Sequence, residues 1–225
     1  GLLASSLPET RLPEQRADSS VGGALRAYGL LLRDRHFMGL VMIGAFGISS
    51  FFAYLANSSF VLIDHYGLSP RQYSIAFAVN AASFIGVSQF TGQLTRRFGL
   101  VPLVRVAVLG YALTMAALLG LNLLGFDSLG LIIAMLLLGY GFLGLVVPTT
   151  AVLALEEHGA LAGTASALMG TLQFVVGATV MAVVGLFVDG TARPMVAGIA
   201  GSALMALAFS LVTLRGQRDR TSIAR

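Results

Sequence analysis

Six apolar stretches, each long enough to cross a lipid bilayer, are separated by short segments that hold nearly all the charged residues. A transmembrane helix needs about 20 mostly apolar residues, and every stretch meets that length. The stretches are Phe37–Ile63, Tyr73–Thr95, Val101–Asn122, Leu129–Leu155, Leu161–Val188 and Met195–Leu214. Arg105, near the start of the third, is the one charged residue inside them. Because helices of a water-soluble core keep a polar face, the pattern predicts an all-α integral membrane protein with a six-transmembrane-helix bundle.

The overall composition indicates the same class. Hydrophobic residues make up 56% of the chain and charged residues only 11%, against roughly 25% charged residues in soluble domains. The net charge of +4 comes from arginines placed between the spans, so we expect no nucleic-acid partner. The chain has no cysteine, and His36, His65 and His158 are far apart at span ends or in loops. We therefore expect no metal site and no cofactor.

The arginines predict how the bundle lies in the membrane. Twelve of the fourteen fall on one side of the predicted spans: Arg11, Arg16, Arg26, Arg33, Arg35, Arg96, Arg97, Arg105, Arg215, Arg218, Arg220 and Arg225. The other side has only Arg71 and Arg193. Since basic residues concentrate on the cytoplasmic side of a membrane, both termini are expected in the cytoplasm.

The segments outside the bundle divide into three parts. The chain opens with Gly1–Ser6, which resembles the end of a preceding apolar span, so we expect a piece of a longer chain. Residues 7–24 are rich in Pro, Glu, Ser and Gly and predict a flexible cytoplasmic linker. From residue 25 to 36, leucines at helical spacing alternate with arginines, which indicates either a short amphipathic helix at the inner membrane surface or an extension of the first span. The domain boundaries are thus 1–36, 37–214 for the bundle, and 215–225 for a cytoplasmic tail.

Small and polar residues predict where helices meet, because apolar surface alone does not drive helices together in lipid. In the fifth span, one face carries Gly163, Ser166, Gly170, Gln173 and Gly177. The small residues predict close helix packing. Gln173 has two interpretations, a hydrogen bond to another helix or a contact with a ligand.

Amides and aromatic rings form stripes on two other spans. The first span places Ser50, Tyr54, Asn57 and Ser58 at helical spacing, and the second places Tyr73, Phe77, Asn80, Phe84 and Thr91 on one stripe. Rings beside amides can hold flat, partly apolar molecules, although ordinary helix packing gives the same stripe. The predicted substrate cavity consists of Tyr54, Asn57, Ser58, Phe77, Asn80, Phe84, Tyr140 and Gln173.

The fourth span combines Gly139, Tyr140, Gly141, Gly144 and Pro148. Proline removes a backbone hydrogen bond and clashes with the preceding turn, so we expect a kink near Gly144 and Pro148. The third and sixth spans are the poorest in polar residues and are expected at the periphery, facing lipid. This division predicts a bundle with an inner side that is more polar and more hydrated than the side facing lipid.

These blocks of sequence resemble a known family. The block from Gly163 to Ala178 (Gly-Thr-Ala-Ser-Ala-Leu-Met-Gly-Thr-Leu-Gln-Phe-Val-Val-Gly-Ala) is similar to span eleven of the bicyclomycin-resistance (Bcr/CflA) branch of the major facilitator superfamily. Further blocks resemble the end of its span six (Leu7–Thr10), its span seven (Phe51–Val61), the following loop (Tyr66–Ser69) and its span ten (Gly141–Thr149). The resemblance implies spans seven to twelve of a twelve-span drug:proton antiporter, built from two inverted three-helix repeats. In that family, spans seven, eight, ten and eleven line the central cavity.

One loop departs from the pattern of the superfamily. The segment from Gly92 to Gly99 lies where a Gly-x-x-x-Asp-Arg-x-Gly motif would recur, but Arg96 replaces the Asp. The resemblance therefore implies only a turn-forming and interface role for Gly92, Arg97 and Gly99. A basic turn that obeys the positive-inside rule explains the two arginines equally well.

The resemblance implies a bacterial inner-membrane exporter of small amphipathic or drug-like molecules, with a role in antibiotic resistance. Proton coupling needs an ionisable group inside the membrane, and no Asp or Glu lies in any of the six spans. We therefore expect the N-terminal half of the same transporter to supply the coupling residue, and this chain alone not to carry out coupled transport. The isolated half is expected to self-associate through its cavity face.

Two other functions stay open, and a third is not expected. A complete six-span protein could form a homodimeric pathway, and a membrane scaffold would share the same helices. An intramembrane enzyme is not expected, because no Ser/Lys, Ser/His or paired-Asp arrangement lies within the spans.

Overall fold

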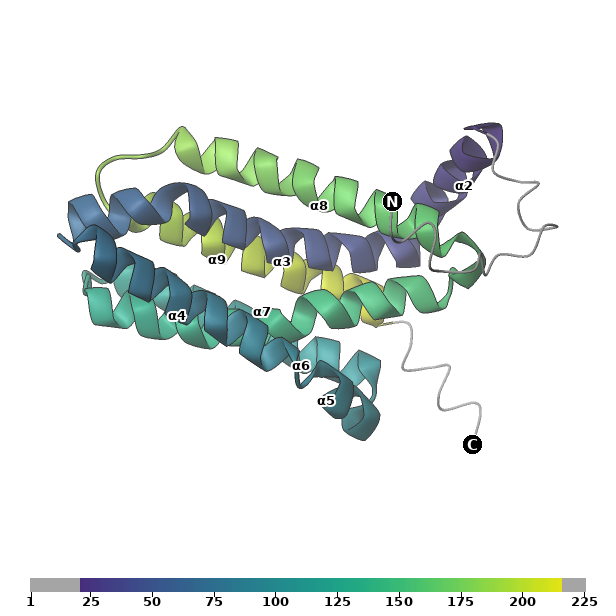
Figure 1. The fold of residues 1–225 in the computed structure, drawn as a ribbon, viewed down its shortest axis with the longest axis horizontal. Coiled ribbons are helices and arrows are strands. Elements are labelled where there is room, and N and C mark those ends of the chain that lie inside the picture. The colour runs from purple at the N-terminus through teal and green to yellow at the C-terminus, as the bar shows by residue number, and fades with distance from the viewer. Residues whose placement is uncertain (1–20, 216–225) are drawn as a thin grey trace, which may run out of the picture.

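The computed structural model describes residues 21–215, which form a bundle of long helices (Figure 1). The long helices are α3 (Arg35–Ser59), α4 (Pro70–Ser88), α6 (Leu100–Leu123), α7 (Leu129–Glu156), α8 (Ala162–Gly185) and α9 (Arg193–Leu214). The short ones are α2 (Val21–Arg33), the π-helical η2 (Phe60–His65), α5 (Thr91–Phe98) and the 3-10 turn η3 (Gly159–Leu161). Among these residues, five helices are long and apolar enough to span a membrane, or six if α4 and α5 form one span. The predicted all-helical membrane fold is confirmed.

The second predicted span, Tyr73–Thr95, is not one straight helix. It is divided between α4 and α5, whose axes differ by 41°. The side chains of Ser88 and Gln89 both donate hydrogen bonds to the carbonyl oxygen of Ile85, at 2.7 and 3.3 Å. Side chains that bond to the preceding turn compete with the backbone ladder and bend helices. The prediction of a continuous helix missed this local competition.

The other end of α4 is defined by its capping residues. Ser69 is the N-cap, and its side chain accepts a hydrogen bond from the backbone N–H of Gln72, while the Gln72 side chain accepts one from the backbone N–H of Ser69. Pro70 follows at the first helical position, where its missing N–H is not needed. This reciprocal arrangement satisfies two backbone donors that a helix start leaves unpaired.

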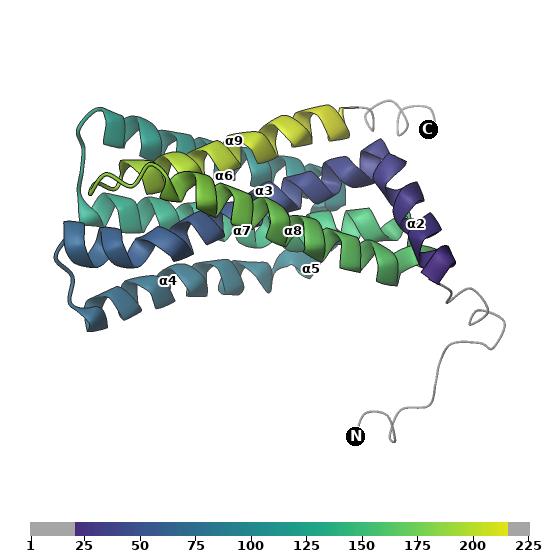
Figure 2. The ribbon, with the colours of Figure 1, turned by 90° about the horizontal axis from the view of Figure 1, so that it is seen from above.

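Helix α3 lies at the centre of the bundle. It packs against α7, α8 and α9, while α6 packs against α7 and α9, and α4 packs mainly against α7. In the view of Figure 2, α6 and α9 lie along one side and α4 along the other. Helices α6 and α9, the third and sixth predicted spans, expose apolar side chains such as Leu113 and Val212; their place at the periphery, facing lipid, stays a prediction. In its most apolar stretch, each of the helices α6, α7 and α9 is 44% buried, whereas α8 is only 22% buried.

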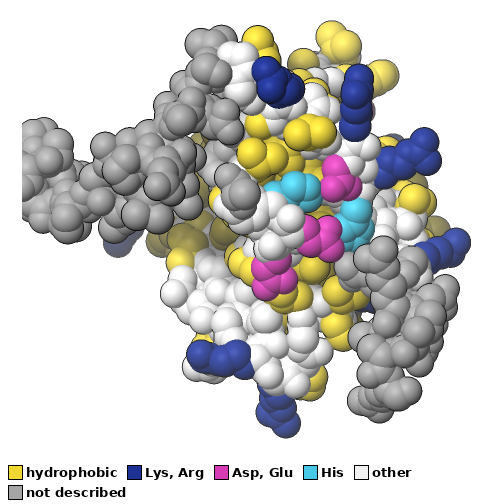
Figure 3. Space-filling view, turned by 90° about the vertical axis from the view of Figure 1, so that its right-hand side faces the viewer, with side chains coloured by type: hydrophobic (Ala, Val, Ile, Leu, Met, Phe, Trp, Pro, Cys, Tyr) yellow, Lys and Arg dark blue, Asp and Glu magenta, His cyan; other side chains and the backbone are white. Residues whose placement is uncertain are grey.

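The two ends of the bundle differ in charge. The first and last described helices, α2 and α9, bring the chain to the same end, which also carries α5 (Figures 1 and 2). At this end the arginine side chains lie around the rim, and acidic and histidine side chains lie nearer the middle (Figure 3). Arg71 and Arg193, at the starts of α4 and α9, lie at the opposite end.

The segments predicted outside the bundle are described only in part. The expected end of a preceding span and most of the linker fall in residues 1–20, and most of the tail falls in residues 216–225, outside the described residues. Residues 21–33 form α2, which is separated from α3 by Asp34 alone. Asp34 has an extended backbone (φ −77°, ψ 104°) and caps α3. Helix α2 is therefore a distinct helix and does not continue α3.

Candidate substrate groove

An open groove of about 420 Å³ lies between α4, α7 and α8, in the half of the bundle nearer the arginine-rich end. It is lined by Phe84, Ser88, Val147, Pro148, Ala151, Leu155, Ser166, Met169, Gly170 and Gln173. We call these ten residues the groove. Its volume lies within the usual range for small-molecule sites, which is about 300–1,000 Å³.

The chemistry of the groove is mostly apolar, with a few hydrogen-bonding groups. None of its ten lining residues is charged. Gln173 supplies an amide, and Ser88 and Ser166 supply hydroxyls. Met169 adds a flexible, polarizable wall, which adapts to ligands of different shape. No atom lies within 4 Å of the position that a side chain at Gly170 would take, so the small residue leaves space in the groove.

A second group of predicted cavity residues forms a buried aromatic cluster between α3, α4 and α7. The rings of Tyr54 and Phe77 are stacked, with centroids 5.7 Å apart and an interplanar angle of 12°. Tyr140 meets Tyr54 edge-on, also at 5.7 Å, and its hydroxyl donates to the carbonyl oxygen of Ser50 at 3.5 Å. Tyr54 and Tyr140 are almost completely buried. This aromatic cluster therefore forms part of the packed interior of the described chain.

The amides and hydroxyls beside these rings are mostly paired within the chain. The side-chain amide of Asn80 donates to the hydroxyl of Tyr54 at 3.2 Å, and that of Asn57 donates to the carbonyl oxygen of Ala53 at 2.9 Å. The hydroxyls of Ser58 and Tyr73 are 3.1 Å apart. The side-chain oxygen of Asn80 is buried and has no partner among the described residues. Asn80 thus keeps one unpaired hydrogen-bond acceptor beside the aromatic cluster.

The eight residues predicted for the cavity consequently fall into two groups. Phe84 and Gln173 line the groove. The other six, Tyr54, Asn57, Ser58, Phe77, Asn80 and Tyr140, lie in or beside the aromatic cluster. Sequence reasoning missed Ser88 and Met169 as lining residues. Ser88 lies four residues after Phe84, so extending the polar stripe of α4 by one more turn would have found it.

The predicted packing role of the small residues holds at some positions only. A side chain at Gly144 would overlap the backbone oxygen of Phe84, so α4 and α7 approach with their backbones there. A side chain at Gly177 would lie 2.8 Å from an atom of the Phe52 ring, and one at Gly139 would overlap the end of the Met115 side chain. At Gly163, as at Gly170, nothing lies within 4 Å. Among residues 21–215, no other helix therefore approaches closely at Gly163 and Gly170.

Pro148 lies inside α7, which continues through it to Glu156. The hydroxyls of Thr149 and Thr150 bond to backbone oxygens of the preceding turn, the latter to that of Val146 at 2.8 Å. Pro148 also lines the groove. The kink itself stays a prediction.

The loop motif lies at the exposed arginine-rich end. Gly92 and Arg97 belong to α5, and Gly99 separates α5 from α6 with a φ of +83°, a conformation that favours glycine. The Arg97 guanidinium lies 5.3 Å from the centroid of the Phe98 ring. The turn-forming role expected of Gly99 is consistent with this geometry.

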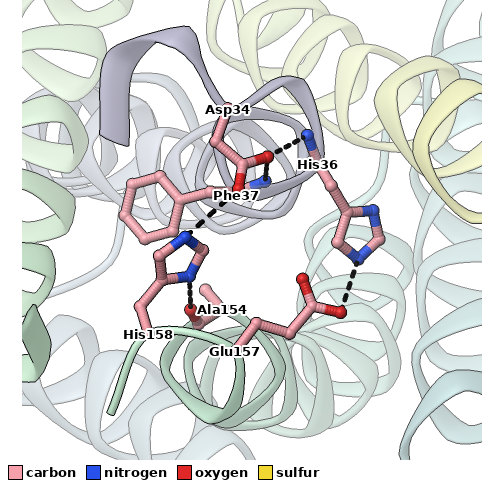
Figure 4. Close-up of polar contacts among 6 residues, drawn as sticks. All are labelled: Asp34, His36, Phe37, Ala154, Glu157 and His158. Atoms are coloured by element: carbon pink, nitrogen blue, oxygen red, sulfur yellow. Dashed lines mark hydrogen bonds and ion pairs between the residues drawn. The ribbon is translucent and has the colours of Figure 1, made fainter. Parts of the chain in front are cut away.

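Two acid–histidine pairs join the start of α3 to the end of α7 (Figure 4). Nε2 of His158 is 3.1 Å from Oδ2 of Asp34, and its Nδ1 is 3.2 Å from the carbonyl oxygen of Ala154. Nε2 of His36 is 4.0 Å from Oε1 of Glu157. The start of α3 with its N-cap, and the turn after α7, each supply one acid and one histidine, so the two contacts cross-link residues that are more than 100 positions apart.

Asp34 is held in its charged form by these contacts. Burial acts to raise the pKa of its carboxyl group, but the backbone N–H groups of Phe37 and His36 and the nearby His158 outweigh burial and lower the pKa. The N–H donors belong to the first turn of α3, where a negative charge is favoured by the helix dipole. The same carboxylate therefore caps α3 and binds the α7–η3 turn.

A comparable cluster closes the opposite end. Nε2 of His65 is 2.8 Å from Oδ2 of Asp127, and the hydroxyl of Tyr66 donates to the other oxygen of Asp127. Burial opposes the charge on Asp127, but the contacts with Tyr66 and His65 and the charge of Arg193 lower its pKa. Burial, followed by the bond to Asp127, raises the pKa of Tyr66. These contacts join the loop after α3 to the loop between α6 and α7.

Metal ligands do not gather anywhere in residues 21–215. No group of three or more His, Cys, Asp or Glu side chains there could hold a metal ion. The acid–histidine pairs at the two ends each hold too few ligands for a structural site.

Comparison with known proteins places the chain in a family. The model of the Major Facilitator Superfamily matches residues 2–182. An uncharacterized MFS-type transporter, YdgK of Bacillus subtilis, is 35% identical over 194 residues, covering 86% of this chain and 48% of that protein. A bicyclomycin resistance protein homolog of Haemophilus influenzae is 28% identical over 232 aligned residues, covering 98% of this chain and 56% of that protein. The chain thus spans about half the length of the curated relatives it matches.

Proposed function

The chain belongs to the Major Facilitator Superfamily, and from this premise we propose that it is the C-terminal half of a proton-coupled exporter of small amphipathic or drug-like molecules. It is a multi-pass membrane protein of a family of transporters, not of enzymes. The observation that carries the proposal is the groove, an apolar wall with an amide and two hydroxyls that opens between α4, α7 and α8. The drug class is supported by the name of one relative, the bicyclomycin resistance protein homolog.

In this proposal the other half of the transporter covers the groove. Helix α8 is the least buried of the candidate spans, and its exposed side chains include Phe174 at 67% and Val175 at 56%. Two halves that rock about a shared midplane site give alternating access. The groove lies in the half of the bundle nearer the arginines, so by the positive-inside rule it opens towards the cytoplasm. A cytoplasmic substrate would enter there, in a bacterial inner membrane with both termini in the cytoplasm.

Proton coupling is assigned to the other half. The six predicted spans contain no Asp or Glu, the acids that could carry a proton inside the membrane. The chain reconstituted alone in liposomes with a pH gradient should therefore show no uphill drug movement. Uphill movement by the chain alone would favour the homodimeric pathway instead.

The test of the groove uses the full-length transporter that contains this sequence. Gln173→Leu and Phe84→Ala remove its amide and its aromatic ring, so both should change which compounds are exported, with unchanged amounts of protein in the membrane. Thr171→Val is the matched control, because Thr171 is exposed on α8, lies outside the groove and bonds only to the carbonyl oxygen of Ala167 in the same helix. An export profile that stays the same in both groove variants would refute the assignment.

A further inference from the structure

Helix α2 has leucines on the side that packs against the bundle and also on sides that the bundle leaves exposed. Leu31 is fully buried and Ala27 is 5% exposed, so this side packs against α3 and α8. Leu25, Leu30 and Leu32 are 66%, 63% and 51% exposed. On the membrane-spanning helices, exposed leucines face hydrocarbon. Helix α2 lies beyond the apolar start of α3, so its leucines need another apolar surface.

Basic side chains accompany these leucines. Arg26 and Arg33 are exposed on α2, and Arg35 is exposed at the start of α3. The acidic residues of the same end lie nearer its middle, where Asp34 and Glu157 pair with histidines (Figures 3 and 4). The rim of a membrane-embedded bundle is the part that meets lipid headgroups, and here the rim is basic while the middle is acidic.

We propose that α2 docks on the surface of an anionic phospholipid leaflet, with Leu25 and Leu32 inserted among the acyl chains and Arg26 and Arg33 on the phosphates. A helix with leucines beside arginines and a length of about 20 Å is suited to the interface between headgroups and hydrocarbon. Each arginine near the surface of an anionic leaflet strengthens binding to that leaflet by about fivefold. This inference goes beyond the proposed transport function and does not depend on it.

The junction between α2 and α3 sets the direction of the docked helix. Asp34 interrupts the two helices with an extended backbone, and it is bound both to the first turn of α3 and to His158 of the α7–η3 turn. Because Asp34 is fixed to two elements, α2 leaves the bundle at a defined angle and does not stack on α3 (Figure 1).

The experiment uses the whole chain, whose sequence contains no cysteine. Single variants Leu25→Cys, Leu32→Cys and, as a control on an exposed turn at the same end, Gly159→Cys carry an environment-sensitive fluorophore. Each is reconstituted in phosphatidylcholine vesicles with and without phosphatidylglycerol. Quenching by a spin label near the lipid headgroup reports insertion, and quenching by iodide reports contact with water.

We expect the labels at residues 25 and 32 to be quenched by lipid and shielded from iodide in the anionic vesicles, and the label at residue 159 to behave in the opposite way. Adding Arg26→Gln and Arg33→Gln should lower the ratio of docked to undocked helix by roughly fivefold per arginine. Iodide quenching at residues 25 and 32 in both kinds of vesicle would overturn the proposal. So would shielding from both quenchers, which would mean a protein cover, or equal docking on neutral lipid.

Discussion

The contact between α4 and α7 at Gly144 gives the sharpest prediction about stability. A β-carbon at Gly144 would overlap the backbone oxygen of Phe84, and it would lie 3.2 Å from the carbonyl carbon of Phe84 and 3.3 Å from the backbone nitrogen of Ser88. All three atoms belong to the backbone, so no side-chain rotation relieves the clash. For Gly144→Ala, the two helices must separate by roughly 1 Å to restore ordinary contact distances.

Overpacking of this kind costs about 1–3 kcal/mol in the free energy of unfolding. Alanine has the better helix propensity by at most about 1 kcal/mol, so the clash outweighs the gain. With a shift of about 2–4 °C per kcal/mol for a chain of this size, the melting temperature of Gly144→Ala in detergent should fall by several degrees.

Two other glycines provide matched controls in the same melting assay. Gly139→Ala would meet the flexible end of the Met115 side chain, which can move aside, and Gly170→Ala would meet nothing within 4 Å. Both should melt within about 2 °C of the parent or above it. A Gly144→Ala protein that melts at the parent temperature would show that α4 and α7 do not touch through their backbones at this point.

Three further substitutions test separate contacts by the same measurement. Arg105→Gln removes the hydrogen bond from Arg105 to the carbonyl oxygen of Leu214 at the end of α9, so the free energy of unfolding should fall by about 1–2 kcal/mol; no change would mean that the bond is absent. Tyr54→Phe leaves the amide of Asn80 without its acceptor and should cost about 1 kcal/mol, whereas adding Asn80→Leu should recover most of that loss. Asp34 has a lowered pKa in the folded chain, so its charge stabilises above about pH 4 and this stabilisation is lost as the pH falls through the folded pKa. Asp34→Asn should therefore melt below the parent at neutral pH, with a gap that closes below about pH 4, and a gap independent of pH would contradict the role of the charge.

The positions of the membrane spans could be predicted from the sequence because the solvent imposes them. A helix that crosses the hydrocarbon requires about 20 mostly apolar residues in a row. Each span can therefore be recognised from its own stretch of sequence. The stretch predicted at Met195–Leu214 corresponds to α9, which begins only two residues earlier at Arg193. The break after Ser88 was missed because single side-chain bonds within the helix cause it.

The contacts between helices could not be predicted to the same degree. Gly170 and Gly177 lie on one predicted face of α8, yet in the described part of the chain Gly177 packs against Phe52 whereas Gly170 has nothing within 4 Å. The difference depends on where Phe52 of α3 lies, which the local pattern of α8 does not contain. The pairing of Asp34 with His158 likewise joins residues 124 positions apart. The amides of Asn57 and Asn80, which were expected in a cavity, lie buried beside aromatic rings in the described chain, and their place in a substrate cavity stays a prediction.

The proposed function requires that the groove between α4, α7 and α8 meets water and cargo, while the exposed side of α9 at Val212 meets lipid. Single cysteines at Ser166 and Gln173 of the groove, and at the exposed Val212 of α9, can be tested in an otherwise cysteine-free full-length transporter with a membrane-impermeant maleimide. We expect the two groove positions to react from the cytoplasmic side and to be protected by an exported drug, while residue 212 does not react. Unreactive groove positions that are quenched by spin-labelled lipid acyl chains would contradict it.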